Sequence, residues 1–180
     1  FWMEAARGID WATPPSRALN ASNAPIFEWF TDSRANTCWN AVDRHVEAGR
    51  GEQIAIIHDS PITHTIRKIT YRELRDRVAT LAGALRKQGI QKGDRVIIYM
   101  PMVPEALEAM LACARLGAIH SVVFGGFAAN ELAVRIDDAT PKAIIAASCG
   151  LEPGRVVHYK PLVDAAIEQA HHKPDFCVIF

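Results

Sequence analysis

Three consecutive stretches decide the fold: GDRVIIYM at residues 93–100, PEALEAMLACARLG at residues 104–117 and IHSVVFGG at residues 119–126. The first contains a short apolar run, which is typical of a parallel strand buried on both faces, and the third predicts the next strand. The middle stretch begins with proline and ends with glycine, the residues that commonly start and stop a helix. Strand, helix and strand at this spacing predict a right-handed βαβ unit.

The same rhythm continues on both sides. Toward the N-terminus, Thr70 to Glu73 fits a capping box, and an apolar stripe predicts a helix that stops at Gly89. Before it, residues 53–58 and 66–70 predict an antiparallel pair of strands. Further elements are expected toward the C-terminus: a helix over 128–139, a strand over 143–147, a loop over 148–155, a helix over 161–170 and a strand over 176–180. The fold class predicted is α/β, with a doubly wound, mostly parallel sheet.

Sheets of this kind bind ligands beyond the carboxyl ends of their strands. At one such end, Phe124-Gly125-Gly126-Phe127 lies between a predicted strand and a predicted helix. Adjacent glycines let a phosphate or a flat ring approach the backbone, and the following helix offers free N–H groups. The sequence is neither GxGxxG nor a P-loop, which would contain GKS or GKT. The alternative interpretation is a plain tight turn.

The next strand end carries a second candidate, Gly150-Leu151-Glu152-Pro153-Gly154-Arg155. The Arg155 guanidinium offers several donors in one plane, which suits a phosphate, although a surface arginine beside a turn is the alternative. The seven histidines form no HxH or HExxH pair, and no GxSxG elbow is present. We therefore predict no catalytic residue and no metal ligand in this chain.

Composition limits the class of protein. The 180 residues are 49% hydrophobic and 22% charged, and twenty basic side chains balance twenty acidic ones. This mix excludes a disordered chain and gives no sign of binding to nucleic acid or to a membrane surface. Four dispersed cysteines without a CxxC pair indicate a reducing compartment rather than disulfides or zinc, and the three that lie among apolar or small residues are predicted to be core thiols. We expect a cytoplasmic protein, with the mitochondrial matrix as the alternative.

The front of the chain differs from the rest. Residues 1 to about 45 are irregular and contain all four tryptophans, with short helices predicted over 1–7 and 38–48. Tryptophans in a loop-rich segment usually anchor it onto a neighbouring surface. The chain begins with Phe1 and ends on the apolar run Phe176–Phe180, which leads us to expect a fragment of a longer protein.

Several motifs are specific enough to carry a family resemblance. ITYREL at residues 69–74 and KGDRV at residues 92–96 resemble the opening of the large domain in acyl-adenylate-forming (AMP-binding) enzymes. RLGAIHSVVFGGF at residues 115–127 resembles their acetyl-CoA synthetase branch. SCGLEPGR at residues 148–155 and HKPD at residues 172–175 are most similar to propionate–CoA ligases. The resemblance covers essentially the whole chain.

The resemblance implies a two-step reaction. A short carboxylate, propionate or acetate, attacks the α-phosphate of ATP to give an acyl-adenylate and pyrophosphate, with Mg²⁺ offsetting the phosphate charge. The CoA thiol then displaces AMP. In the family, the phosphate loop and the mobile C-terminal domain come later, so the ATP and Mg²⁺ sites are expected outside this chain and the segment alone is expected to be inactive. Residues 1–50 would be an N-terminal extension packing on the core, and residues 51–180 the first part of the AMP-binding domain, truncated before the phosphate loop.

The resemblance also implies part of a CoA site. Phe124, Gly125 and Gly126 correspond to positions that lie against the CoA adenine. The stretch Glu152-Pro153-Gly154-Arg155 occupies the loop that contacts the CoA phosphates. In acetyl-CoA synthetases this loop typically begins with arginine, so Glu152 removes or moves one phosphate contact and leaves Arg155 as the cation.

Two other functions stay open from the residues alone. One is a free-standing, non-catalytic α/β module that binds a nucleotide or a partner through its strand ends. The other is a flavodoxin-like redox protein, for which phosphate-binding hydroxyls are sparse at the strand ends. For the synthetase, the expected partners are propionate or acetate, ATP, CoA and the remainder of its own chain, without nucleic acid or membrane.

Overall fold

The computed structural model describes residues 1–180 and contains one four-stranded parallel sheet. In spatial order its strands are β12 (Phe176–Ile179), β9 (Ala143–Ala146), β7 (Arg95–Met100) and β8 (Ile119–Phe124). β7 pairs with β8 on one side and with β9 on the other, and β12 extends the sheet beyond β9. The predicted parallel sheet is confirmed.

The position of each strand in the sheet explains its burial. β9 is buried throughout and β7 from Val96 to Met100, because each has a strand on both sides and helices on both faces. β8 is an edge strand, and its Ile119, Val122 and Phe124 are 56%, 52% and 67% exposed. The hydrophobic core therefore centres on β7 and β9 and the helices packed against them.

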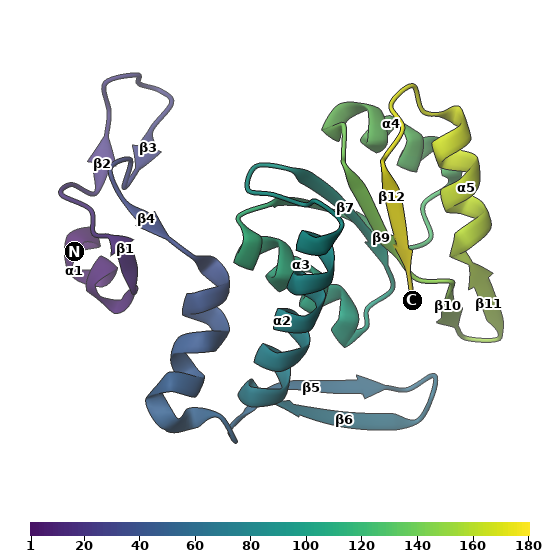
Figure 1. The fold of residues 1–180 in the computed structure, drawn as a ribbon, viewed down its shortest axis with the longest axis horizontal. Helices are drawn as coiled ribbons and strands as arrows, with labels where there is room; N and C mark the ends of the chain where they lie inside the picture. Colours follow the sequence, from purple (N-terminus) through teal and green to yellow (C-terminus); the bar gives the residue numbers. More distant parts are fainter.

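Helices cover both faces of the sheet (Figure 1). α2 (Tyr71–Lys87) packs against α3 (Pro104–Leu116), and α4 (Ala129–Ala139) packs against α5 (Tyr159–Gln169). α3 connects β7 to β8 in one direction across the sheet, whereas the crossovers that contain α4 and α5 run in the other direction. Right-handed connections then put the two pairs of helices on opposite faces. The doubly wound arrangement is confirmed, and its direction reverses between β7 and β9.

Local signals for the first helices are also confirmed. The Thr70 hydroxyl accepts a hydrogen bond from the Glu73 N–H, and the Glu73 carboxylate accepts one from the Thr70 N–H at 2.8 Å. α3 ends at Gly117, whose φ of +73° is left-handed. β5 (Ile54–Ser60) and β6 (Thr65–Thr70) form the predicted antiparallel pair, which projects from the base of α2 (Figure 1).

The prediction of a loop over residues 148–155 is wrong. β10 (Cys149–Glu152) and β11 (Arg155–His158) form an antiparallel hairpin, and α5 follows directly at Tyr159. The strands are joined by Pro153-Gly154, where Gly154 has a φ of +75°. A hairpin with a two-residue connection therefore replaces the loop, and it holds the second candidate segment in a defined register.

The cysteines differ in burial, and all of them are free thiols. Cys38 and Cys113 are fully buried, and burial raises the pKa of Cys113 to about 11. Cys149 is half-buried in the hairpin, and Cys177 is exposed in the edge strand β12. The prediction of core thiols is right for the first two only, because strand position decides burial for the others.

The N-terminal extension is built from small elements. It begins with α1 (Trp2–Ala5) and η1 (Ala6–Gly8). Two small antiparallel pairs follow, β1 (Trp11–Thr13) with β4 (Arg34–Ala35) and β2 (Leu19–Asn20) with β3 (Glu28–Trp29). Two wide helical turns, η2 (Trp39–Asp43) and η3 (Val46–Arg50), lead from the extension toward the sheet. The small pairs lie apart from the four-stranded sheet (Figure 1).

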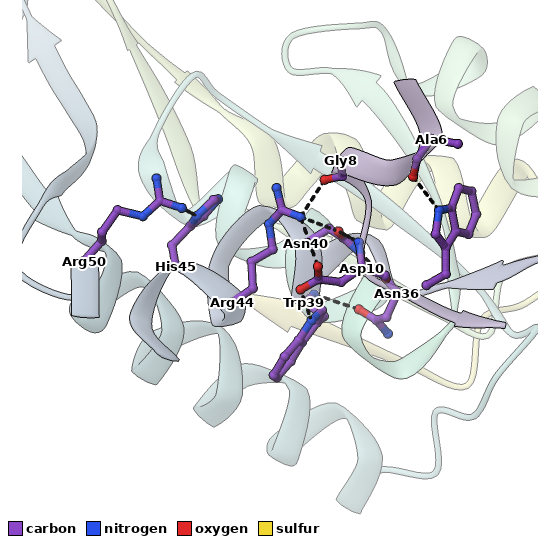
Figure 2. Close-up of polar contacts among 10 residues, drawn as sticks. Ala6, Gly8, Asp10, Asn36, Trp39, Asn40, Arg44, His45 and Arg50 are labelled. Atoms are coloured by element: carbon purple, nitrogen blue, oxygen red, sulfur yellow. Dashed lines mark hydrogen bonds and ion pairs between the residues drawn. The ribbon is translucent and has the colours of Figure 1, made fainter. Parts of the chain in front are cut away.

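A polar network centred on Arg44 holds the first residues of the extension to the helical turn of η2 (Figure 2). The Arg44 guanidinium donates to the carbonyl oxygen of Gly8 at 2.8 Å and to Oδ1 of Asn40 at 3.2 Å. It also lies 3.5 Å from the Asp10 carboxylate, which accepts a hydrogen bond from the Trp39 indole at 3.1 Å. The first residues of the chain are thereby tied to the helix that follows them.

The tryptophans bond and pack within the extension. Trp2 and Trp29 meet edge to face with their ring centroids 5.4 Å apart, and they remain 54% and 48% exposed. The Trp11 indole donates to the carbonyl oxygen of Ala6 at 2.7 Å. Trp2, Trp11 and Trp29 therefore make these contacts with other residues of the extension, and their role as anchors onto a neighbouring surface stays a prediction.

Other residues tie the extension to the helices of the sheet. The Arg115 guanidinium at the end of α3 donates to Oδ1 of Asp43 at 2.5 Å, and Asp43 is only 9% exposed. The Asn36 side-chain amide donates to the carbonyl oxygens of Ala114 and Arg115 at 3.1 and 3.2 Å. The buried thiol of Cys38 lies 3.7 Å from the other oxygen of Asp43. An ion pair between the half-buried Arg115 and the buried Asp43, together with a cap on the last carbonyls of α3, thus forms the junction.

Candidate ligand site at the carboxyl edge of the sheet

The turn after β8 runs close against the carboxyl end of β7. A methyl group at Gly125 would lie 2.7 Å from the carbonyl oxygen of Met100, so only glycine allows this approach of the two backbones. Gly126 follows with a φ of +105°, which also favours glycine. Phe124 and Gly126 are exposed on either side of the buried Gly125. The result is a tight turn that presents bare backbone and one aromatic ring to solvent.

Tyr99 holds this turn from the inside of the sheet. Its ring is fully buried, and its hydroxyl donates to the carbonyl oxygen of Phe127 at 2.8 Å and accepts from the Gly126 N–H at 3.2 Å. Burial raises the pKa of Tyr99, and the hydrogen bond from Gly126 partly opposes that shift. The only sequence signal for this role is a tyrosine near the end of an otherwise aliphatic strand.

Tyr159, the first residue of α5, joins the turn to the β10–β11 hairpin. It is 3% exposed, and its ring packs obliquely on Tyr99 with the centroids 5.1 Å apart. A methyl group at Gly125 would lie 2.8 Å from the Tyr159 hydroxyl, and one at Gly150 would lie 2.7 Å from Cζ of the same ring. The two candidate segments, which follow different strands, therefore meet at one side chain.

Glu152 and Arg155 flank the hairpin turn and pair across it. Nη2 of Arg155 lies 2.6 Å from Oε2 of Glu152, and Nε of Arg155 donates to the same oxygen at 2.7 Å. Because side chains alternate along a strand, Glu152 shares with Gly150 the face that is turned to Tyr159. The raised pKa of Tyr159 has burial as its main cause, and the charges of Tyr99 and Glu152 add to it. Arg155, which the sequence predicts to bind an anionic ligand, is thus ion-paired with the Glu152 carboxylate of the same turn.

Aromatic and basic groups surround the exposed edge of the turn. The Phe124 ring is 67% exposed and lies 5.7 Å from the Phe127 ring, centroid to centroid. The guanidinium carbon of Arg135, on α4, lies 5.6 Å from the centroid of Phe127. Arg135 is absent from the residues predicted by sequence, because it lies within an ordinary amphipathic helix. An exposed ring beside bare backbone can stack on a flat ligand, and Arg135 and Arg155 can bind its anionic groups.

A pocket lies on the opposite face of the hairpin. It has a volume of about 470 Å³ and is lined by residues 58–63, residues 101–103, Cys149 and Leu151. Cys149 and Leu151 alternate with Gly150 and Glu152, so the pocket is separated from Tyr159 by the strand itself. The candidate site is therefore an open surface beside the turn and the hairpin rather than an enclosed cavity.

Metal binding and insertion into a membrane are two further functions that the structure can address. No three His, Cys, Asp or Glu side chains come together in a group that can hold a metal ion. No helix has both the length and the hydropathy that crossing a bilayer requires.

Known proteins share this sequence over nearly its whole length. The profile of the AMP-binding enzyme family matches residues 42–178, and the profile of the acetyl-coenzyme A synthetase N-terminus matches residues 1–41. The chain is 58% identical to an uncharacterized protein of Pseudomonas aeruginosa over 100% of its length. It is 53% identical to the mitochondrial acyl-CoA synthetase short-chain family member 3 of Bos taurus over 100% of its length, and 51% identical to propionate–CoA ligase of Escherichia coli over 97%.

The chain spans 29%, 26% and 28% of the length of these three relatives, respectively. The match to the AMP-binding profile includes β7, β8 and β9 together with all four helices packed on the sheet. The turn after β8 and the β10–β11 hairpin also lie within the matched residues. The fold agrees with this match, and the chain belongs to the family of AMP-binding enzymes.

Proposed function

We propose that this chain is the N-terminal part of a short-chain acyl-CoA synthetase, an acid–thiol ligase. The whole enzyme would convert propionate or acetate, ATP and CoA into acyl-CoA, AMP and pyrophosphate through an acyl-adenylate. Identities of 53% to an acyl-CoA synthetase and 51% to a propionate–CoA ligase support this activity. Propionate is the preferred carboxylate in this proposal, because the stretches at residues 148–155 and 172–175 are most similar to propionate–CoA ligases. ATP and Mg²⁺ would bind elsewhere in the enzyme.

The role proposed for this segment is to hold the nucleotide end of CoA. The single observation that carries it is the meeting of the Phe124–Gly126 turn and the hairpin at Tyr159. The adenine would lie on the Phe124 ring and the bare backbone of Gly125 and Gly126. The phosphates would lie beside Glu152-Pro153-Gly154-Arg155, with the Arg155 guanidinium donating to them. Holding this end fixed directs the CoA thiol toward the acyl-adenylate, which other parts of the enzyme form.

The proposal also divides the chain into two parts. Residues 1–50 would form an extension that packs on residues 51–180, the first part of the adenylation domain, and the ion pair of Asp43 with Arg115 supports this packing. The partners would be the small-molecule substrates and the remainder of the same chain. The compartment would be the cytoplasm or the mitochondrial matrix; the name of the relative from Bos taurus calls that protein mitochondrial.

Arg155→Ala in the whole enzyme should raise the KM for CoA by about tenfold, because a hydrogen bond to a charged group contributes about 1.5 kcal/mol. Carboxylate-dependent exchange between ATP and pyrophosphate requires no CoA and should stay unchanged. Steady-state formation of propionyl-CoA and acetyl-CoA, together with the exchange assay, measures both steps. Glu152→Gln should have the opposite effect. It removes the ion pair of Arg155 and a negative charge beside the phosphates, so the KM for CoA should fall.

Arg75→Ala serves as the control, since the half-buried Arg75 forms an ion pair with the exposed Asp76 on α2, outside the candidate site. Its KM for CoA should equal that of the wild type. An equal loss of exchange and of thioester formation in Arg155→Ala would contradict the role in CoA binding. A wild-type enzyme that forms neither thioester would contradict the proposed activity.

A further inference from the structure

We infer that Tyr159 is a positioning residue for CoA: its ring is the spacer that sets the distance between the Phe124–Gly126 turn and the β10–β11 hairpin. The inference rests on the proposed function, because it assigns these two segments to one nucleotide. It adds a residue that contacts neither a reacting atom nor, by this argument, the ligand itself. Tyr159 acts through the two segments that it keeps apart.

The first argument comes from the two glycines that contact the tyrosine. At Gly150 the three atoms nearest to an added methyl group all belong to the Tyr159 side chain. Gly150 does not have the left-handed φ of Gly126 or Gly154, so its backbone conformation would accept alanine. Glycine is therefore needed at position 150 because the ring of Tyr159 fills the space.

The second argument comes from how firmly the ring is held. The Tyr159 N–H donates to the carbonyl oxygen of Ser148 at 3.0 Å, and Ser148 in turn donates its N–H to Phe180 at the end of β12 at 2.7 Å. On its inner side the ring packs against Tyr99, whose hydroxyl is hydrogen-bonded to the turn. The spacer is thus fixed to the sheet at its backbone and at its ring.

The third argument separates the ring from its hydroxyl. The Tyr99 hydroxyl both donates and accepts hydrogen bonds, whereas the Tyr159 hydroxyl forms none with the protein. Volume rather than a hydrogen bond therefore keeps the two segments apart. A nucleotide held at its adenine by one segment and at its phosphates by the other depends on their spacing, and small misplacements in such sites are costly.

The test compares two substitutions at this position in the whole synthetase. Tyr159→Leu removes the ring, and the KM for CoA should rise by at least about fivefold, while kcat stays within about twofold of the wild type. ATP–pyrophosphate exchange should not change. Tyr159→Phe keeps the ring and loses only the hydroxyl, so all parameters should remain those of the wild type. Tyr71→Leu is the matched control, because Tyr71 is also the first residue of a helix and lies outside the site, against His45.

A second pair of variants guards against simple misfolding. Gly150→Ala alone should raise the KM for CoA, because its methyl group displaces the ring. Combined with Tyr159→Leu it should add no further loss, since the obstructing ring is gone. Full additivity in this cycle would overturn the inference, and so would a normal KM for CoA in Tyr159→Leu.

Two other results would also overturn it. Equal loss of exchange and CoA use in Tyr159→Leu, with Tyr71→Leu unaffected, would mean that Tyr159 only stabilises the fold. A defect of the same size in Tyr159→Phe would mean that the hydroxyl, not the ring, carries the effect. If Arg155→Ala raises the KM for CoA and Tyr159→Leu does not, the inference fails while the proposed function stands. If neither variant changes the KM for CoA, the proposed role of this segment in CoA binding fails, and the inference that rests on it fails as well.

Discussion

Replacing Arg115 by methionine should lower the free energy of opening the N-terminal extension by about 3 kcal/mol, the lower end of the cost of breaking a buried ion pair. Methionine fills similar space but leaves the Asp43 carboxylate, 9% exposed and beside the Cys38 thiol, without its cation. Amides of η2 and η3 should then exchange with solvent about a hundredfold faster. Hydrogen-exchange mass spectrometry of the whole protein measures this difference.

A solvent-exposed ion pair near the same junction provides the control. Arg72 pairs with Glu52 at 2.7 Å, and both side chains are more than half exposed. Arg72→Ala should change exchange in the extension by less than about 1 kcal/mol, as is usual for surface pairs. Equal exchange rates in the Arg115 and Arg72 variants would show that the buried pair does not hold the extension in place.

Gly125→Ala should lower kcat/KM for CoA by about a hundredfold, the size of effect that a displacement of about 1 Å can produce in a binding site. The added methyl group would lie 2.7 Å from the Met100 carbonyl oxygen and 2.8 Å from the Tyr159 hydroxyl, so the backbone of the turn has to move. The strain should also lower stability by about 2 kcal/mol, as overpacking commonly does. Steady-state kinetics with CoA as the varied substrate and thermal unfolding measure the two effects.

Gly83→Ala is the matched control for this substitution. Gly83 lies inside α2, and an added methyl group would have no atom within 4 Å. Alanine there should raise stability by about 0.5–1 kcal/mol and leave CoA kinetics unchanged, because it favours the helix without new contacts. Wild-type CoA kinetics in Gly125→Ala would remove the turn after β8 from the site.

The sheet could be predicted from sequence because its strands have unmistakable local patterns. Residues 96–100 and 143–146 are unbroken apolar runs, which is what burial on both faces requires. The hairpin over residues 149–158 could not, because glycine and proline near its turn are equally typical of a loop.

The residues of the candidate site likewise fall into those that a local sequence pattern indicates and those that it does not. Phe124, Gly125, Gly126 and Arg155 have local signatures, an aromatic residue beside paired glycines and a cation after a turn. Tyr159 has none, because its importance arises only when α5 brings it between segments from two other strands. The tryptophans predict packing of the extension onto a neighbouring surface; within the extension, Trp2 and Trp29 pack on each other and remain about half exposed. The residue type indicates that an aromatic side chain will pack against other residues, but it does not indicate which residues these are.

The strand order of the sheet also has a consequence for its assembly during synthesis. β7 and β8 leave the ribosome first, with α3 between them, and can pair as a unit. β9 then joins the free side of β7, and β12 joins the free side of β9. Every later strand is added at an existing edge, so a growing chain never has to reopen a ladder that has already formed.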